Sequence, residues 1–224
     1  MTPGARIAAT ACSITLALAC LGLAYQEGNL SLSRTAFLQW QSSLEPADLA
    51  RFQRRIGRAG TGINPEATLL DARARMMLAE GVTPSEAEPI RSQLLEELED
   101  LAGQRPTDYQ PWVLMARLLL RQGRLPSDGF DTALRRALGL GPNQSRTFAE
   151  LFPELWLSWY LLDPEQRQLA GDYAVRTAWR EPRWAMDTAL RYGFLDPMCD
   201  QSAGNRLALD HCRRLGWTPI DSTP

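Results

Sequence analysis

Nineteen consecutive uncharged residues at positions 7–25 constrain this chain more than any other feature of its sequence. As an α-helix they would rise roughly 28 Å, at ~1.5 Å per residue, which matches the hydrocarbon thickness of one bilayer. Arg6 precedes them, whereas Glu27 follows and the next arginine is Arg34. Because cytoplasmic flanks carry the excess of basic residues, the sequence predicts one transmembrane helix with a cytoplasmic N-terminus and no polybasic patch beyond the membrane.

Two other N-terminal signals fit the same residues. A cleavable signal peptide would be cut after residues 22–24, and a lipoprotein signal would place the lipid on Cys20. The apolar run is longer than a usual signal-peptide core of about 7–15 residues, and it continues past Cys20, so an uncleaved anchor is favoured. All three signals send the rest of the chain across the membrane.

Composition excludes several classes of function. The 224 residues include 24 arginines, no lysine, 26 acidic residues and one histidine, His211, with a formal net charge of −2 and an isoelectric point near 5.6. The absence of lysine excludes Schiff-base and P-loop lysine chemistry, and a single histidine excludes any site that needs two imidazoles. Without excess positive charge, sequence-independent binding of nucleic acid is not expected.

The remaining sequence predicts an all-α fold. Apolar residues recur at three and four steps, and glycine and proline interrupt them at intervals of roughly 15–20 residues, with no alternating strand pattern. The predicted organisation is an N-terminal stub and transmembrane anchor at 1–25, a juxtamembrane stalk at 26–47, a helical domain at 48–217 and a flexible tail at 218–224.

The clearest repeat lies between Pro106 and Pro142. Two helices are predicted there, and the second ends at the Gly-Leu-Gly-Pro sequence of residues 139–142. This segment resembles the tetratricopeptide pattern, although its turn near residues 126–128 is two residues longer than usual. The resemblance implies a stack of helical hairpins that binds partners through its surface. The residues that carry it are Trp112, Ala116, Phe130, Leu134, Ala137 and Pro142.

One side of the first helix in this repeat is a candidate partner-binding groove. In tetratricopeptide repeats this side usually faces the groove, and here it carries Gln110, Val113, Arg117 and Arg121. The two arginines lie one turn apart and repel each other by roughly a few tenths of a kcal/mol when solvated. An acidic peptide or partner surface would relieve that repulsion, whereas plain solvent-exposed arginines are the alternative.

Cys199 and Cys212 form a candidate disulfide, because the predicted topology places them in an oxidising compartment if the host is bacterial. On one continuous helix their Cα atoms would lie roughly 20 Å apart, whereas bridged Cα atoms lie within about 7 Å. The bridge therefore requires Cys199 in the loop after Pro197 and a new helix that begins near residues 204–205. Two independent buried thiols are the alternative.

No catalytic, cofactor-binding or metal-binding pattern emerges from the sequence. The acidic run at 96–100 predicts a solvated helix face, because nothing nearby would separate the pKa values of its carboxyl groups. The cysteines, acids and histidine at 199–212 lack the spacing of a zinc site. The aromatic residues at 156–160, Trp179 and Trp184 favour a packed core over a sugar-stacking platform. We therefore expect a protein that is not an enzyme and needs no cofactor.

Five segments carry a further resemblance that covers most of the chain: residues 7–25, 37–40, 105–112, 137–142 and 212–217. In their order, these features resemble the VpsP-like family of polysaccharide-biosynthesis proteins. The resemblance implies a bacterial inner-membrane protein with a periplasmic helical domain, which acts as an adaptor for protein partners in a membrane-associated polysaccharide assembly complex. No small-molecule substrate is expected. The alternatives are an assembly factor for a pilus, secretion or cytochrome-maturation complex, and a glycan-handling enzyme.

Overall fold

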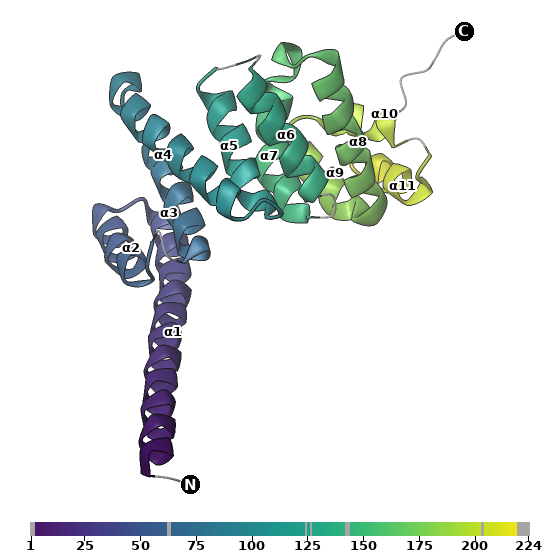
Figure 1. The fold of residues 1–224 in the computed structure, drawn as a ribbon. Coiled ribbons are helices and arrows are strands. Elements are labelled where there is room, and N and C mark those ends of the chain that lie inside the picture. The colour runs from purple at the N-terminus through teal and green to yellow at the C-terminus, as the bar shows by residue number, and fades with distance from the viewer. Residues whose placement is uncertain are drawn as a thin grey trace. The chain divides into compact units, whose positions relative to one another are not determined.

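The computed structural model describes residues 3–61, 64–123, 125, 127–141, 144–202 and 204–218, with side chains from residue 18 onward. These residues form eleven α-helices and one short 3-10 helix and contain no strand, which confirms the predicted all-α class (Figure 1). Among them, no helix combines the length and the apolar character that a membrane crossing needs. The side chains at 7–17 of the predicted span, and residues 219–224 of the predicted tail, lie outside the described part.

Contacts divide the chain into unit 1, Met1–Ile90, and unit 2, Arg91–Pro224. The division falls inside one helix, whereas the sequence placed its boundaries at residues 25 and 47. The helices are α1 (Pro3–Ser43), α2 (Pro46–Arg58), α3 (Pro65–Leu78), α4 (Pro84–Gln104), α5 (Tyr109–Arg121), α6 (Asp128–Leu140), α7 (Ser145–Leu157), the 3-10 helix η1 (Trp159–Leu161), α8 (Pro164–Arg180), α9 (Pro182–Arg191), α10 (Leu195–Gln201) and α11 (Arg206–Arg214).

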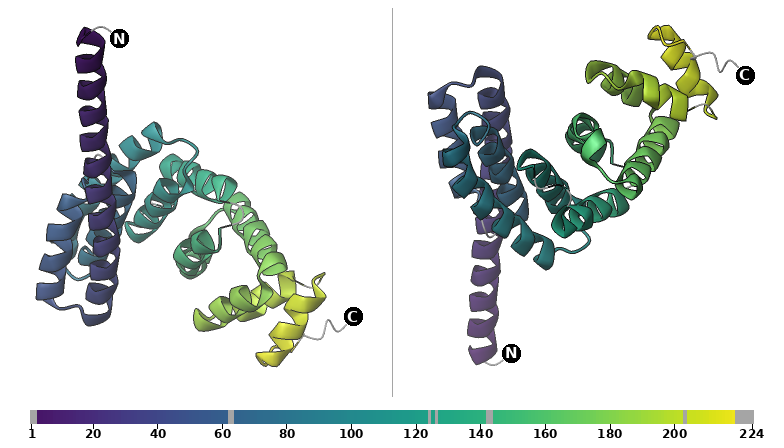
Figure 2. Two further views of the ribbon diagram at one scale, coloured as in Figure 1. Left: turned by 90° about the horizontal axis from the view of Figure 1, so that it is seen from below. Right: turned by 90° about the horizontal axis from the view of Figure 1, so that it is seen from above.

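Unit 1 is built around a hairpin of α1 and α2. Leu44 ends α1 in the left-handed conformation (φ 57°) and turns the chain back, so that α2 lies alongside the C-terminal half of α1 (Figure 2). The ring of Phe52 then packs 5.6 Å from that of Phe37 and 6.4 Å from that of Trp40. Residues 26–43, predicted as part of a stalk, are thus helical and supply four of the ten buried members of a hydrophobic core.

The third helix of unit 1 closes this core. Asn64 caps α3 by accepting hydrogen bonds from the backbone N–H groups of Glu66 and Ala67, which satisfies donors that the first turn leaves unpaired. Small and apolar side chains of α3 then join those of α1 and α2 in one cluster. Its buried members are Leu30, Ala36, Phe37, Trp40, Phe52, Ile56, Ala59, Ala67, Leu70 and Ala74.

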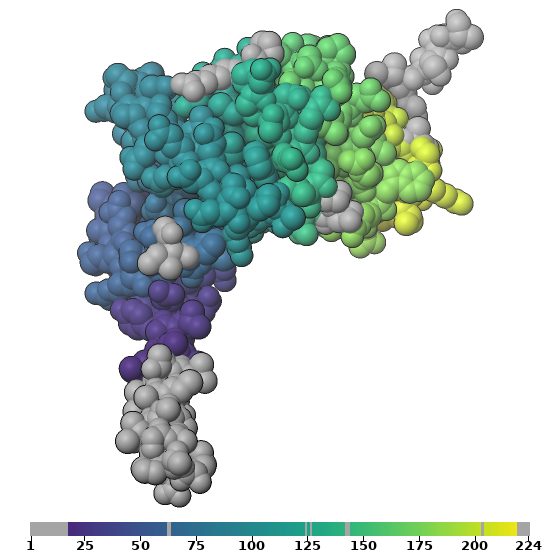
Figure 3. Space-filling model, in the orientation of Figure 1, coloured from purple at the N-terminus to yellow at the C-terminus, as the bar shows by residue number. Residues whose placement is uncertain are grey.

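Unit 2 contains the predicted repeat. The two predicted helices of this repeat are α5 and α6, which pack against each other, and α5 also contacts α7. Asp108 and Ser127 cap their N-termini, and each helix buries an apolar stripe at the expected spacing. In the space-filling view of Figure 3, side chains fill the gaps that the ribbon drawing of Figure 1 leaves between these helices. Pro126 and Pro142, which the repeat pattern uses, lie outside the described residues.

The connection between α6 and α7 is held by one tyrosine of α8. The buried Tyr173 hydroxyl donates toward the carbonyl oxygens of Gly141 and Gln144, at 3.0 and 2.9 Å. Gly141 fits beneath this bond network only because it has no side chain. A Cβ there would lie 2.9 Å from Thr147 Oγ1 and 3.0 Å from both the Ala137 carbonyl oxygen and a Tyr109 ring carbon.

Tyr173→Phe should lower the free energy of unfolding by about 1–2 kcal/mol, because it leaves two carbonyl groups without their shared donor. Burial also raises the pKa of Tyr173 from 10 to about 12. The folded state therefore retains the phenolic proton that the unfolded state loses above pH 10, and stability should fall as pH rises from 10 toward 12. Denaturant unfolding across this range measures both effects. An equally steep pH dependence in Tyr173→Phe would contradict the assignment to this residue.

Candidate binding cleft beside the disulfide

In the predicted groove on α5, the two arginines are bound within the chain. Glu154 of α7 lies between them: Arg117 Nε is 2.8 Å from Glu154 Oε1, and Arg121 Nη2 is 2.7 Å from the same oxygen. The side chain of Arg117 is only 18% exposed, that of Arg121 is 27% exposed, and that of Glu154 is 15% exposed. The acidic group that would relieve the repulsion is therefore part of unit 2.

The other two residues of the predicted groove are also part of the packing. Val113 is 2% exposed, and Gln110 is half-buried in the first turn of α5. This side of α5 therefore contributes to the interior of unit 2 and is not an open surface. The sequence could not reveal this, because Glu154 lies 33 residues beyond Arg121 and nothing in the local pattern pairs them.

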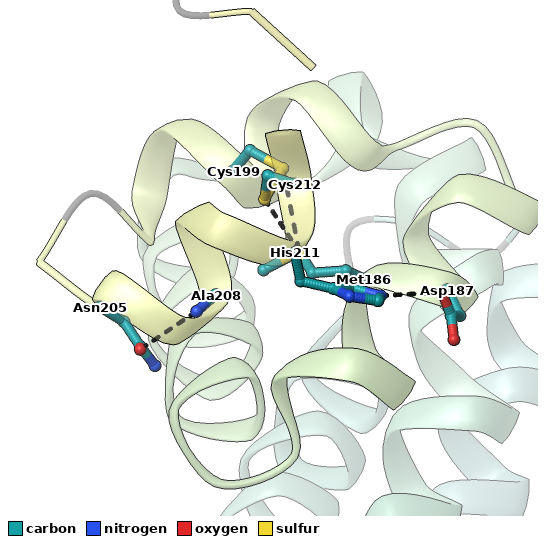
Figure 4. Close-up of a disulfide and its surroundings, with 7 residues drawn as sticks. All are labelled: Met186, Asp187, Cys199, Asn205, Ala208, His211 and Cys212. Atoms are coloured by element: carbon teal, nitrogen blue, oxygen red, sulfur yellow. Dashed lines mark hydrogen bonds and ion pairs between the residues drawn. A yellow bond between two sulfur atoms is a disulfide. The ribbon is translucent and has the colours of Figure 1, made fainter. Parts of the chain in front are cut away.

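Cys199 and Cys212 are joined by a disulfide that links α10 to α11 (Figure 4). Their Cα atoms lie 6.0 Å apart. Asn205 caps α11, so the helix begins where the geometric argument required. The expectation of a loop at Cys199 is wrong, since this residue lies in the short helix α10. The bridge forms because the chain reverses between the two helices.

The disulfide lies against α9. Met186 Sδ is 3.5 Å from Cys212 Sγ and 3.9 Å from Cys199 Sγ, and all three residues are buried. One residue further along α9, Asp187 Oδ1 lies 3.0 Å from Nε2 of His211, as the dashed line in Figure 4 shows. Two contacts thus fix α11 against α9, one of them apolar and one polar.

A cleft of about 470 Å³ opens between α9 and α11 on the outside of this contact. Its apolar part comes from Pro182, the half-buried indole of Trp184, and Leu207, whose side chain is 71% exposed. The ring of Phe148 supports Trp184 from inside at a centroid distance of 5.5 Å. The imidazole of His211 and four charged residues complete the lining: Glu181, Arg183, Asp210 and Arg214.

The two acidic residues of this cleft have hydrogen-bond or ion-pair partners, whereas its two arginines have none in the described part of the chain. Glu181 accepts a hydrogen bond from Ser145 at 2.6 Å, and Asp210 lies 3.4 Å from Arg213. Arg183 and Arg214 are both exposed, and neither has an ion-pair partner among the residues that the structure describes. The cleft therefore combines an apolar floor with two available guanidinium groups, which suits a ligand that carries an apolar group beside a carboxylate or phosphate.

The predicted aromatic core is found in part. Trp156 packs against Trp159 and Phe194, with centroid distances of 5.6 and 5.5 Å. Tyr160, in contrast, is 92% exposed, and Trp184 lines the cleft. The sequence missed the cleft because α9 and α11 are separated by α10 and are brought together only by tertiary contacts.

The described residues include no cluster of candidate metal ligands. No group of three or more histidine, cysteine or acidic side chains among them is placed to hold a metal ion. In the acidic run on α4, Glu96, Glu99 and Asp100 are exposed, as expected for a solvated face. No protein-family model matches the chain, and no curated protein or solved structure is significantly similar to it.

Proposed function

We propose that this chain is a membrane-anchored, non-enzymatic adaptor that supports the biosynthesis or export of a bacterial surface polysaccharide. The anchor is the uncharged segment at 7–25, and the helical units lie in the periplasm. The Cys199–Cys212 disulfide supports this location, because structural disulfides persist in oxidising compartments. The order of sequence features that resembles VpsP-like proteins supports the link to polysaccharide.

The body of the adaptor is proposed to be a stack of tetratricopeptide-like hairpins. Two observations support this: α5 and α6 pack as consecutive helices, and α5 also contacts the first helix of the following pair, α7. In such stacks each hairpin buries its apolar face against its neighbours, so the function resides in surfaces that remain open.

The cleft between α9 and α11 carries the proposal. Its exposed Leu207 and half-buried Trp184 would hold an apolar side chain, and Arg183 and Arg214 would bind an adjacent carboxylate. A partner protein that presents an apolar residue beside an acidic one satisfies both requirements. The partner thus binds by surface contact, and no bond is made or broken.

Charge reversal in the cleft should weaken partner binding. In Arg183→Glu/Arg214→Glu, the loss of two favourable charges and the gain of two repulsive ones should weaken the interaction at least about tenfold. Arg191→Glu/Arg206→Glu is the matched control, because these exposed arginines lie on the same two helices but do not line the cleft. Affinity purification of the full chain from detergent-solubilised membranes, with quantitative mass spectrometry, measures the difference.

The identity of the recovered proteins tests the function. Wild-type chain should recover glycosyltransferase, chain-length or export components of a polysaccharide system, and the cleft variant should lose them. Recovery of pilus, secretion or haem-maturation proteins would contradict the polysaccharide role. Equal recovery by the cleft variant and the control would contradict the assignment of the cleft.

A further inference from the structure

The hairpin of unit 1 carries α2 back along α1 toward the N-terminal half of that helix. Three contacts fix the antiparallel register: Ser43 donates to Asp48, Arg51 donates to Gln39, and the rings of Phe37 and Phe52 pack 5.6 Å apart. Figure 2 shows the same arrangement in both views. The C-terminal end of α2 therefore lies beside a part of α1 that is close to the predicted membrane span.

The register gives the distance between the C-terminal end of α2 and the end of the predicted membrane span. Arg58 lies opposite about residue 32 of α1, which is roughly seven residues, or about 10 Å along the helix, beyond Tyr25. The headgroup region of a bilayer adds about 5–8 Å outside the hydrocarbon core. An extended arginine side chain is long enough to cover the few ångströms that remain between Arg58 and the headgroups of a bilayer crossed by residues 7–25.

The end of α2 is rich in unpaired positive charge. Arg54, Arg55 and Arg58 have no ion-pair partner among the described residues, and Arg54 and Arg58 are exposed. Arg51, one turn earlier, is neutralised by Asp48 at 2.8 Å. We call Arg54, Arg55 and Arg58 the α2 arginine cluster.

The other charges at this end of unit 1 leave the cluster uncompensated. Arg34 and Glu66 form an exposed pair with each other at 3.3 Å. Glu27 on α1 is the remaining acidic side chain between the predicted span and this pair. The local balance is therefore positive, although the chain as a whole has a net charge of −2.

We propose that the α2 arginine cluster binds the phosphate groups of anionic phospholipids in the same bilayer that α1 crosses. This inference rests on the membrane anchor of the proposed function. Guanidinium groups bind phosphate oxygens in pairs, and each basic residue near an anionic surface strengthens binding roughly fivefold. The expectation of no polybasic patch overlooked this site, because the cluster is far from the span in sequence and near it only through the hairpin.

The test uses full-length protein in nanodiscs of phosphatidylcholine, with or without phosphatidylglycerol. A fluorophore is attached to Gly57→Cys in a Cys12→Ser/Cys20→Ser background, since position 57 is exposed and a side chain there meets no neighbour. A quencher is carried on the lipid headgroup. Quenching should rise when phosphatidylglycerol is present and should fall again in high salt, which screens the charges.

Three glutamine substitutions decide the role of the cluster. Arg54→Gln/Arg55→Gln/Arg58→Gln should weaken the lipid-dependent quenching, with the ratio of membrane-bound to unbound hairpin reduced at least roughly fivefold by the loss of Arg58. The matched control is Arg180→Gln/Arg191→Gln/Arg206→Gln, which removes three exposed arginines of unit 2 and should behave as wild type. A fluorophore at Gln41→Cys, near the far end of the hairpin, should report no quenching in either lipid.

The outcomes distinguish a failure of the proposed lipid contact from a failure of the proposed membrane anchor. Protein that does not enter nanodiscs, and is released from membranes by alkaline carbonate, contradicts the membrane anchor itself. Protein that enters nanodiscs but shows equal quenching in both lipids, or equal quenching in the glutamine variant and wild type, overturns the lipid contact and leaves the anchor intact.

Discussion

Glu154→Gln is expected to lower the free energy of unfolding by about 3 kcal/mol. In the wild type, one carboxylate neutralises Arg117 and Arg121, and all three side chains are less than one-third exposed. Glutamine has nearly the same shape but leaves two guanidinium groups side by side without a counter-charge. Because they are partly buried, water cannot fully replace the lost carboxylate. Denaturant unfolding monitored by circular dichroism gives the change in free energy.

Two further variants isolate the cause. Glu165→Gln removes an exposed partner of Arg135, with side chains 72% and 42% exposed, and should cost less than about 0.5 kcal/mol. Adding Arg117→Gln to Glu154→Gln removes one of the two like charges and should recover part of the lost stability. If Glu154→Gln and Glu165→Gln lower the free energy of unfolding equally, the partly buried ion pairs of Glu154 stabilise unit 2 no more than an exposed pair does.

Loss of the Cys199–Cys212 bridge is expected to have an effect of similar size. The bridge closes a loop with a sequence separation of 13, for which chain entropy alone predicts about 3 kcal/mol. Cys199→Ala/Cys212→Ala, or reduction of the wild type, should therefore lower the midpoint of thermal unfolding measured by calorimetry. Cys20→Ser is the control, because Cys20 is an exposed free thiol.

The same change should affect the cleft. The bridge holds α11 to α10, and α11 supplies Leu207, His211 and Arg214 to the lining. Partner binding should therefore weaken under reducing conditions that leave the helical content unchanged. Identical melting curves with and without reductant would contradict a stabilising role for the bridge.

Much of the secondary structure could be predicted from the sequence, because local patterns of apolar spacing and helix capping indicate it. The helices at 109–121 and 128–140 follow from apolar spacing and from caps such as Asp108 and Ser127. The start of α11 followed from the distance limit that a bridge between Cys199 and Cys212 imposes. In each case the relevant residues lie within about four helical turns of one another.

The candidate sites could not be predicted in the same way, because they depend on residues that are distant in sequence. Arg117 was assigned to an open groove because its counter-ion, Glu154, lies 37 residues away. The cleft needs α9 and α11 together, and the α2 arginine cluster comes to lie beside α1 only through the turn at Leu44. Local periodicity states which face of a helix is apolar, but it does not state which helix covers that face.

The continuity of α1 has a mechanical consequence. This helix runs from Pro3 to Ser43, so the predicted anchor and the core residues Phe37 and Trp40 belong to one continuous helix. A single residue inserted between positions 25 and 30 would turn the part of unit 1 that follows the insertion by about 100° about the axis of α1, relative to residues 7–25. A contact that fixes the rotation of residues 7–25 would therefore also fix the direction in which the α1–α2 hairpin faces.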